Sequence, residues 1–181
     1  MPRRGFIPLQ SNVKRQRSNF VTGFTFIELI MVILIIAILS TVIITDIINS
    51  TSLAKLEGAR WKLKSGLSYA QSLAVTQQVN HGIIFTPPNI YSVYKQTTGN
   101  IVNNPLTGST FTVDYSADSY LIGVIISSTS FGSPTTNTVG FDSNGAPSDG
   151  TNPLAIDGSV TLSYAGRTAA ITVTKNTGKI N

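Results

Sequence analysis

The pattern of apolar and polar residues divides the chain into four successive segments. Residues 1–23 are mixed in polarity, and residues 24–48 are almost wholly apolar. Residues 49–79 show helical periodicity, and residues 80–181 alternate apolar and polar positions. We therefore predict a leader peptide, an apolar helix, an amphipathic continuation of that helix and a β-rich globular head.

The second segment, 24–48, reads FTFIELIMVILIIAILSTVIITDII, and no residue from Leu29 to Thr45 is charged. An apolar helix needs roughly 20 residues to cross a bilayer, and this segment is long enough. Basic residues precede it and Asp46 closes it. Because loops rich in Lys and Arg stay in the cytoplasm, we expect the leader inside and the head outside.

The third segment has apolar residues at spacings of mainly three, four and seven, which places them on one face of a helix. These residues are Leu53, Leu56, Leu63, Leu67, Ala70 and Ala74. Such a face needs an apolar partner, and we expect the sheets of the head to provide it.

The fourth segment contains short alternating runs separated by clusters of Gly, Asn, Asp, Pro and Ser, a pattern typical of antiparallel strands. We predict strands at 82–86, 90–95, 111–115, 120–127, 138–142, 160–164 and 169–173. The predicted fold class is α+β, with a long N-terminal helix packed on an antiparallel, β-sandwich-like head.

Composition removes several kinds of site. The chain of 181 residues has no cysteine and one histidine, so disulfides, thiolate zinc sites, cysteine nucleophiles and multi-histidine metal sites are excluded. Five of the 13 basic residues lie in residues 1–23, which contain no acid, whereas the remainder carries eight basic and eight acidic residues. A basic leader on a neutral body indicates targeting.

Gly23 and Glu28 stand at unusual places around the apolar segment. A secretory signal has its small-residue cleavage site after the apolar run, whereas Gly23 precedes the run. Glu28 puts a carboxylate among apolar residues, which costs several kcal/mol near a bilayer core unless the charge is paired or protonated. Cleavage after Gly23 would create an amine on Phe24 that can pair with Glu28, within one chain or between chains. Alternatively, Glu28 lies at the cytoplasmic interface, where water solvates it.

The run Gly23-Phe24-Thr25-Phe26-Ile27-Glu28-Leu29, followed by Ile30-Met31-Val32-Ile33-Leu34-Ile35-Ile36-Ala37-Ile38-Leu39, resembles the class III signal of type IV pilins and type II secretion pseudopilins. The resemblance implies that a prepilin peptidase cuts between Gly23 and Phe24 and methylates the Phe24 amine. It also implies that Glu28 pairs with the N-terminus of an adjacent subunit during assembly.

Two departures from the family pattern favour a minor subunit. Many major pilins have proline where this chain has Thr45, and many close a C-terminal loop with a disulfide, which this chain cannot form because it has no cysteine.

Near the C-terminus, TVGFDSNGAP at 138–147 and TGKI at 177–180 are similar to the H-type minor pseudopilins and related minor pilins.

Other candidate chemistry is weak. His81 is expected to be a structural or solvated residue, because no catalytic motif accompanies it, and we expect no enzyme and no cofactor. Asp142-Ser143-Asn144-Gly145 resembles the start of a calcium loop, but Pro153 stands where an acid is needed. We therefore favour an ordinary turn and no metal, with Asp149 and Asp157 the nearby acids that a calcium site would require.

Lys55, Arg60, Lys62 and Lys64 form a small basic run, with Arg167, Lys175 and Lys179 as a thinner group near the C-terminus. Clustered cations can bind nucleic acid through phosphates. A solvated helix face explains the run more simply, so nucleic acid is not an expected partner.

The resemblance leads us to expect a structural subunit, a minor type IV pilin or a pseudopilin. The protein would sit in the bacterial inner membrane, single-pass, with its leader cytoplasmic and its head periplasmic. It would then join a cell-surface pilus or a periplasmic type II secretion pseudopilus through its N-terminal helix. The implied partners are prepilin peptidase, other pilin or pseudopilin subunits, an inner-membrane assembly platform and membrane lipid. Two alternatives remain: a DNA-binding minor pilin for DNA uptake, and an uncleaved, single-span, membrane-anchored β-domain.

Overall fold

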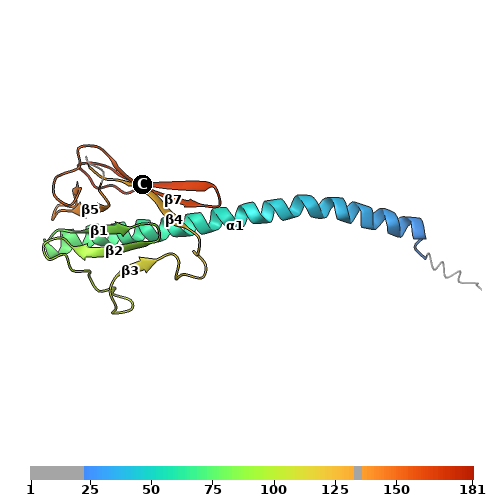
Figure 1. Cartoon of the computed structure of the whole chain (residues 1–181), viewed down its shortest axis with the longest axis horizontal. Helices are drawn as coiled ribbons and strands as arrows, with labels where there is room; N and C mark the ends of the chain where they lie inside the picture. Colours follow the sequence, from blue (N-terminus) through green and yellow to red (C-terminus); the bar gives the residue numbers. More distant parts are fainter. Residues whose placement is uncertain (1–22, 133–135) are drawn as a thin grey trace, which may run out of the picture. The chain divides into compact units, whose positions relative to one another are not determined.

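The computed structural model describes residues 23–132 and 136–181, including the helical backbone but not the side chains of residues 41–49. One long helix, α1 (Phe26–Gln77), is followed by short strands (Figure 1). The chain divides into two compact units at Ile43/Ile44. The first contains the start of α1, and the second contains the rest of the helix and all the strands.

The end of α1 is closed by its own sequence. Gln78 takes a left-handed backbone conformation with φ 53°. Its side-chain nitrogen donates a hydrogen bond of 2.7 Å to the carbonyl of Val75. One of the carbonyls left unpaired at a helix C-terminus is thereby satisfied.

The head contains two antiparallel sheets. The first has the strand order β3-β2-β1-β5-β6 and the second the order β4-β7-β8. The strands are β1 (His81–Thr86), β2 (Ile90–Lys95), β3 (Thr112–Asp114), β4 (Ile125–Ser130), β5 (Thr138–Phe141), β6 (Pro147–Ser148), β7 (Gly158–Tyr164) and β8 (Arg167–Val173). The predicted α+β class, with a helix packed on antiparallel sheets, is confirmed.

The core lies between the second half of α1 and the sheets. Five of the six residues in the predicted stripe are buried, namely Leu56, Leu63, Leu67, Ala70 and Ala74. Leu53 is 48% exposed, so its assignment to the stripe was wrong, and Ala59 takes an inward position that the prediction missed. The spacing of apolar residues therefore identified the buried face, but it started that face too early and missed Ala59.

Two buried tyrosines tie the helix to the first sheet and the loop beside it. The hydroxyl of Tyr91 donates to the carbonyl of Lys62 at 3.0 Å, and that of Tyr115 donates to the carbonyl of Ala59 at 3.1 Å. Burial raises the pKa of both phenols, so they remain neutral donors. Each hydroxyl is satisfied where the ring is removed from water.

The predicted strands agree with the observed ones except in two places. The strand predicted over 120–127 was wrong in its first part, because residues before Ile125 form a turn around Asp118. The Asp118 carboxylate accepts hydrogen bonds from the N–H groups of Tyr120 and Leu121, which holds the chain in the turn. β6 was missed, because its two residues lie inside a predicted turn cluster.

Gly82 in β1 offers a direct test of the packing between strands. A Cβ at this position would lie 2.3 Å from the carbonyl oxygen of Val139 and 2.8 Å from the Cα of Gly140. Because backbone cannot yield as a side chain can, Gly82→Ala is expected to lower the free energy of unfolding by about 2–3 kcal/mol.

Urea unfolding of a 50–181 fragment provides the measurement. All buried core residues lie between Leu56 and Val173, so this fragment retains the complete core. Gly58→Ala is the control, since its Cβ would meet Tyr120 at an ordinary 3.4 Å. Equal unfolding midpoints for Gly82→Ala and the parent would contradict the strand packing described.

Candidate processing and assembly segment

The residues on both sides of the predicted cleavage point lie in irregular, exposed chain just before α1. Gly23 is exposed, and a Cβ added to it would meet nothing within 4 Å. Its φ is not among the positive values that favour glycine. Phe24 is 83% exposed. The fold thus gives no reason for glycine at 23; the leader residues 1–22 lie outside the described part.

Thr25 caps the helix that follows. Its side-chain oxygen accepts a hydrogen bond of 3.2 Å from the N–H of Glu28, and its carbonyl accepts one of 3.2 Å from the N–H of Leu29. This is the N-cap arrangement that satisfies one of the unpaired N–H groups at a helix start. This role was not predicted, although the pattern Thr-x-x-Glu is the signature of a capping box.

Glu28 therefore belongs to the first turn of α1, where it is exposed. The N-terminus of a helix carries a partial positive charge, so a carboxylate there stabilises the helix by about 0.3–1 kcal/mol. This benefit is local to one chain. The predicted pairing with a neighbouring subunit requires a second chain, and it stays a prediction.

The first part of α1 exposes apolar side chains on all sides. Eleven of its large hydrophobic residues are exposed, as is their neighbour Phe24, with exposed fractions from 46% at Val32 to 83% at Phe24. A helix that is apolar all round is normally buried, either in other protein or in a membrane. The isolated chain offers this segment no covering partner among the described residues of its own unit.

Ser40, a polar residue within this segment, satisfies its hydroxyl inside the helix. The hydroxyl of Ser40 donates to the carbonyl of Ile36 at 2.7 Å. Ala37, Ser40 and Thr41 are small enough to let another helix approach closely. The side chain of Thr41 lies outside the described residues.

In the part of the chain that the structure describes, no helix meets the combined length and hydropathy needed to cross a membrane.

His81 lies at the start of β1 and is buried. Its Nδ1 is 2.7 Å from the carbonyl oxygen of Val79. The side chain is thus enclosed and bonded within the core, which agrees with the structural role predicted for it.

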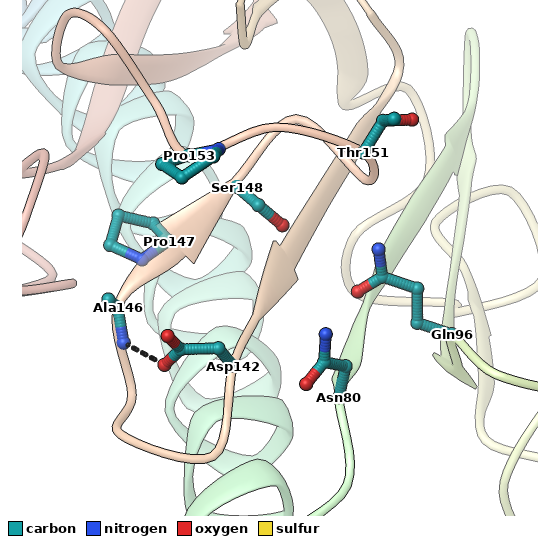
Figure 2. Close-up of a pocket in the computed structure, with 8 residues that line it drawn as sticks. All are labelled: Asn80, Gln96, Asp142, Ala146, Pro147, Ser148, Thr151 and Pro153. Atoms are coloured by element: carbon teal, nitrogen blue, oxygen red, sulfur yellow. Dashed lines mark hydrogen bonds between the residues drawn. The ribbon is translucent and has the colours of Figure 1, made fainter.

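A small polar hollow lies beside the loop considered for calcium (Figure 2). Its volume is about 180 Å³, and Figure 2 shows Asn80, Gln96 and Ser148 around it. The Asp142 carboxylate turns toward Ala146 and accepts the N–H groups of Asn144 at 2.9 Å and Ala146 at 2.8 Å. Asp142 therefore stabilises its own turn, and within the described residues no group of acids and histidines is arranged to hold a metal.

The basic residues of α1 engage separate partners. Arg60 lies 3.4 Å from Glu57, and Lys62 lies 2.8 Å from Asp118. Lys55 and Lys64 lie over the rings of Tyr164 and Trp61, at 5.3 and 5.4 Å from the ring centroids. The four cations are thus divided among different contacts rather than gathered toward one phosphate-binding surface.

Comparison with known proteins shows that this fold is similar to that of two solved structures. No protein-family model and no curated protein sequence matches the chain. Among solved structures, the chain is similar to the type IV minor pilin FimU of Pseudomonas aeruginosa, with 17% identity, 72% of this chain and 90% of that chain covered, and a TM-score of 0.47. It is also similar to the minor pseudopilin EpsH of the type 2 secretion system of Vibrio cholerae, with 11% identity, 70% and 94% covered, and a TM-score of 0.50.

The EpsH comparison is the one that decides the architecture. The chain has a pilin-like fold. In this fold, residues 23–28 are exposed and lie at the N-terminal end of α1, where Thr25 caps the helix. The comparison concerns the fold and leaves the roles of Gly23, Phe24 and Glu28 as predictions.

Proposed function

We propose that this protein is a minor type IV pilin or a pseudopilin, cleaved between Gly23 and Phe24 and built into a filament through α1. The observation that carries the proposal is the first part of α1, which exposes apolar side chains on every side and begins three residues after an exposed glycine. A large exposed apolar surface on a folded protein marks a protein or membrane contact. The pilin-like fold supports the same role.

The exposed Gly23–Phe24 bond is suited to a peptidase. A glycine that its own fold does not need is explained if another protein recognises it. Cleavage would release the basic leader and leave an ammonium group on Phe24. In the proposed reaction, methylation of this amine retains its positive charge.

The new ammonium explains why an acid at residue 28 is useful to a filament subunit. The ammonium adds positive charge to a helix end that is already partly positive. A neighbouring helix entering an apolar bundle can bring its Glu28 against this amine. A subunit in that register avoids a buried unpaired charge, which costs several kcal/mol.

Before assembly, the same apolar segment would anchor the protein in the inner membrane, with the head in the periplasm. Residues 24–48 have the composition for this, although the side chains of residues 41–49 lie outside the described part. Ser40 satisfies its hydroxyl within the helix, which lowers the cost of placing it in lipid. A peptidase and an assembly platform in that membrane would be its partners.

Membrane fractionation tests the proposed anchor. The full chain is expected to remain in the membrane pellet after alkaline carbonate extraction, because about 20 apolar residues anchor it. The 50–181 fragment, exported with a conventional signal, serves as the matched control and is expected in the soluble periplasmic fraction. Release of the full chain by carbonate would contradict membrane anchoring through residues 24–48.

A further inference from the structure

We infer that the head carries a membrane-contacting rim, formed by Lys55, Tyr120, Ile122 and Tyr164, that binds anionic lipid headgroups. This inference goes beyond filament assembly, but it takes from the proposed function that residues 24–48 lie in a bilayer. The rim belongs entirely to the second compact unit. It unites two exposed apolar side chains, a second tyrosine and a cation at one end of the head.

The loop 118–124 holds its apolar residues outward in a fixed arrangement. Tyr120 and Ile122 are 51% and 53% exposed, whereas Leu121 between them is buried in the core. The Asp118 carboxylate fixes this turn by accepting the N–H groups of Tyr120 at 3.0 Å and Leu121 at 3.3 Å. The exposed pair is therefore held by the fold, and no rearrangement is needed for it to meet a surface.

The loop and the β7–β8 hairpin meet the same part of α1. The ring of Tyr120 lies 3.4 Å from where a Cβ on Gly58 would be. Tyr164, the last residue of β7, accepts a hydrogen bond of 3.5 Å from Lys55 and supports its ammonium 5.3 Å from the ring centroid. These contacts place Lys55, Tyr120 and Tyr164 beside the stretch of α1 from residue 55 to residue 58. Ile122 belongs to the same loop, and a Cβ on its neighbour Gly123 would lie 2.9 Å from the Tyr164 ring.

This stretch of α1 lies close in sequence to the end of the predicted membrane segment. Lys55 comes seven residues after residue 48, the last of the predicted membrane segment. At 1.5 Å per residue, this corresponds to a rise of about 10 Å. The headgroup region extends roughly 5–7 Å beyond the hydrocarbon core on each side, so this stretch of the helix begins near the outer edge of that region.

The chemistry of the rim also matches that surface. Tyrosine is enriched in the interfacial region, which accommodates its apolar ring and its polar hydroxyl, and isoleucine adds apolar surface. Two acids near the rim residues in the sequence pair with other cations, Glu57 with Arg60 and Asp118 with Lys62. Lys55 therefore contributes a positive charge that anionic headgroups can neutralise.

Charge decides between lipid and a second copy of the chain as the occupant. Two copies meeting symmetrically through this rim would bring one Lys55 toward the other, and like charges facing each other oppose the contact. An anionic bilayer instead attracts the cation and accepts both exposed apolar side chains. We therefore assign the rim to lipid, and contact with another subunit becomes an outcome that the experiment can detect.

Vesicle flotation with the 50–181 fragment tests the assignment, once cooperative unfolding has shown that the fragment is folded. The fragment is expected to float with vesicles of phosphatidylglycerol and phosphatidylcholine, and not with phosphatidylcholine alone. The double variant Tyr120→Ser/Ile122→Ser should lower the partition coefficient about tenfold, because it removes two apolar groups from the interface. Lys55→Gln should remove most of the dependence on salt.

The matched control is Leu106→Ser/Ile156→Ser, which removes two exposed apolar residues (92% and 58% exposed) from elsewhere on the head. It should bind vesicles as the parent does. The assignment is overturned if the parent ignores anionic vesicles, or if the rim variant binds them equally well. It is also overturned if the rim variant keeps vesicle binding but loses cross-links to other subunits. Because the fragment lacks the cleavage point, these results are independent of whether the full chain is processed after Gly23.

Discussion

Replacement of Gly23 by leucine is expected to leave the leader attached, so that the protein accumulates in its longer form. Gly23 is exposed, and a side chain there would meet no other atom within 4 Å. The chain itself therefore tolerates the substitution, and any defect arises in the peptidase. An enzyme pocket that excludes a side chain commonly discriminates by about 10²-fold or more.

Intact mass and gel mobility of the membrane-extracted variant give the readout. Gly23→Ala is the graded control, since its smaller side chain should permit partial processing. Both variants should keep the thermal stability of the head, because residue 23 lies outside its core. Normal processing of Gly23→Leu would show that the glycine is not what the peptidase recognises.

Loss of the carboxylate at position 28 should affect filament assembly far more than it affects the helix. As a first-turn acid, Glu28 contributes about 0.3–1 kcal/mol to its own helix, which corresponds to at most about a fivefold effect. If it also neutralises a neighbouring amine in an apolar bundle, removing it leaves an unpaired charge that costs about 3–5 kcal/mol. Glu28→Ala and Glu28→Gln are therefore expected to reduce incorporation about 10²-fold or more.

The comparison with Thr25 separates the two roles. Thr25→Ala removes the N-cap hydrogen bond to the Glu28 N–H but keeps the charge. It should weaken the helix start by about 1 kcal/mol and reduce incorporation only modestly. Incorporation is measured by quantifying the tagged subunit in sheared or cross-linked filaments, with cleavage verified in every variant. If Glu28→Gln is cleaved and assembles like the parent, the proposed pairing role of Glu28 is wrong.

Periodicity predicted the parts of the fold that follow regular burial. The stripe on α1 from Leu56 to Ala74 is buried as predicted, because helical spacing directly determines which side chains share a face. The β7–β8 pair was equally predictable, since Val160 and Leu162 alternate with polar residues and are buried. Alternation of this kind identifies strands with one face in the core.

Local hydrogen bonding explains what periodicity missed. The apolar run Tyr120–Gly123 resembled a strand, but the Asp118 carboxylate holds it in a turn and leaves Tyr120 exposed. Strand pairing with residues far along the chain is also invisible in the pattern, as the short β6 beside β5 illustrates. Such features depend on tertiary contacts, which a single sequence does not specify.

The sequence suggests where the candidate site lies but does not give its local structure. The order of glycine, phenylalanine and acid gave the cleavage and assembly hypotheses from the sequence. The capping role of Thr25 and the place of Glu28 in the first helical turn came from the structure. They show that one short segment serves both the helix start and, in the proposal, the contact between subunits.

Determination of the first residue of the full-length protein, extracted from the membrane of cells that contain a prepilin peptidase, tests the central claim most directly. N-terminal sequencing with intact mass is predicted to find a chain that begins at Phe24 and carries one methyl group on its α-amine. A chain that begins at Met1, or at any residue other than Phe24, would contradict the account.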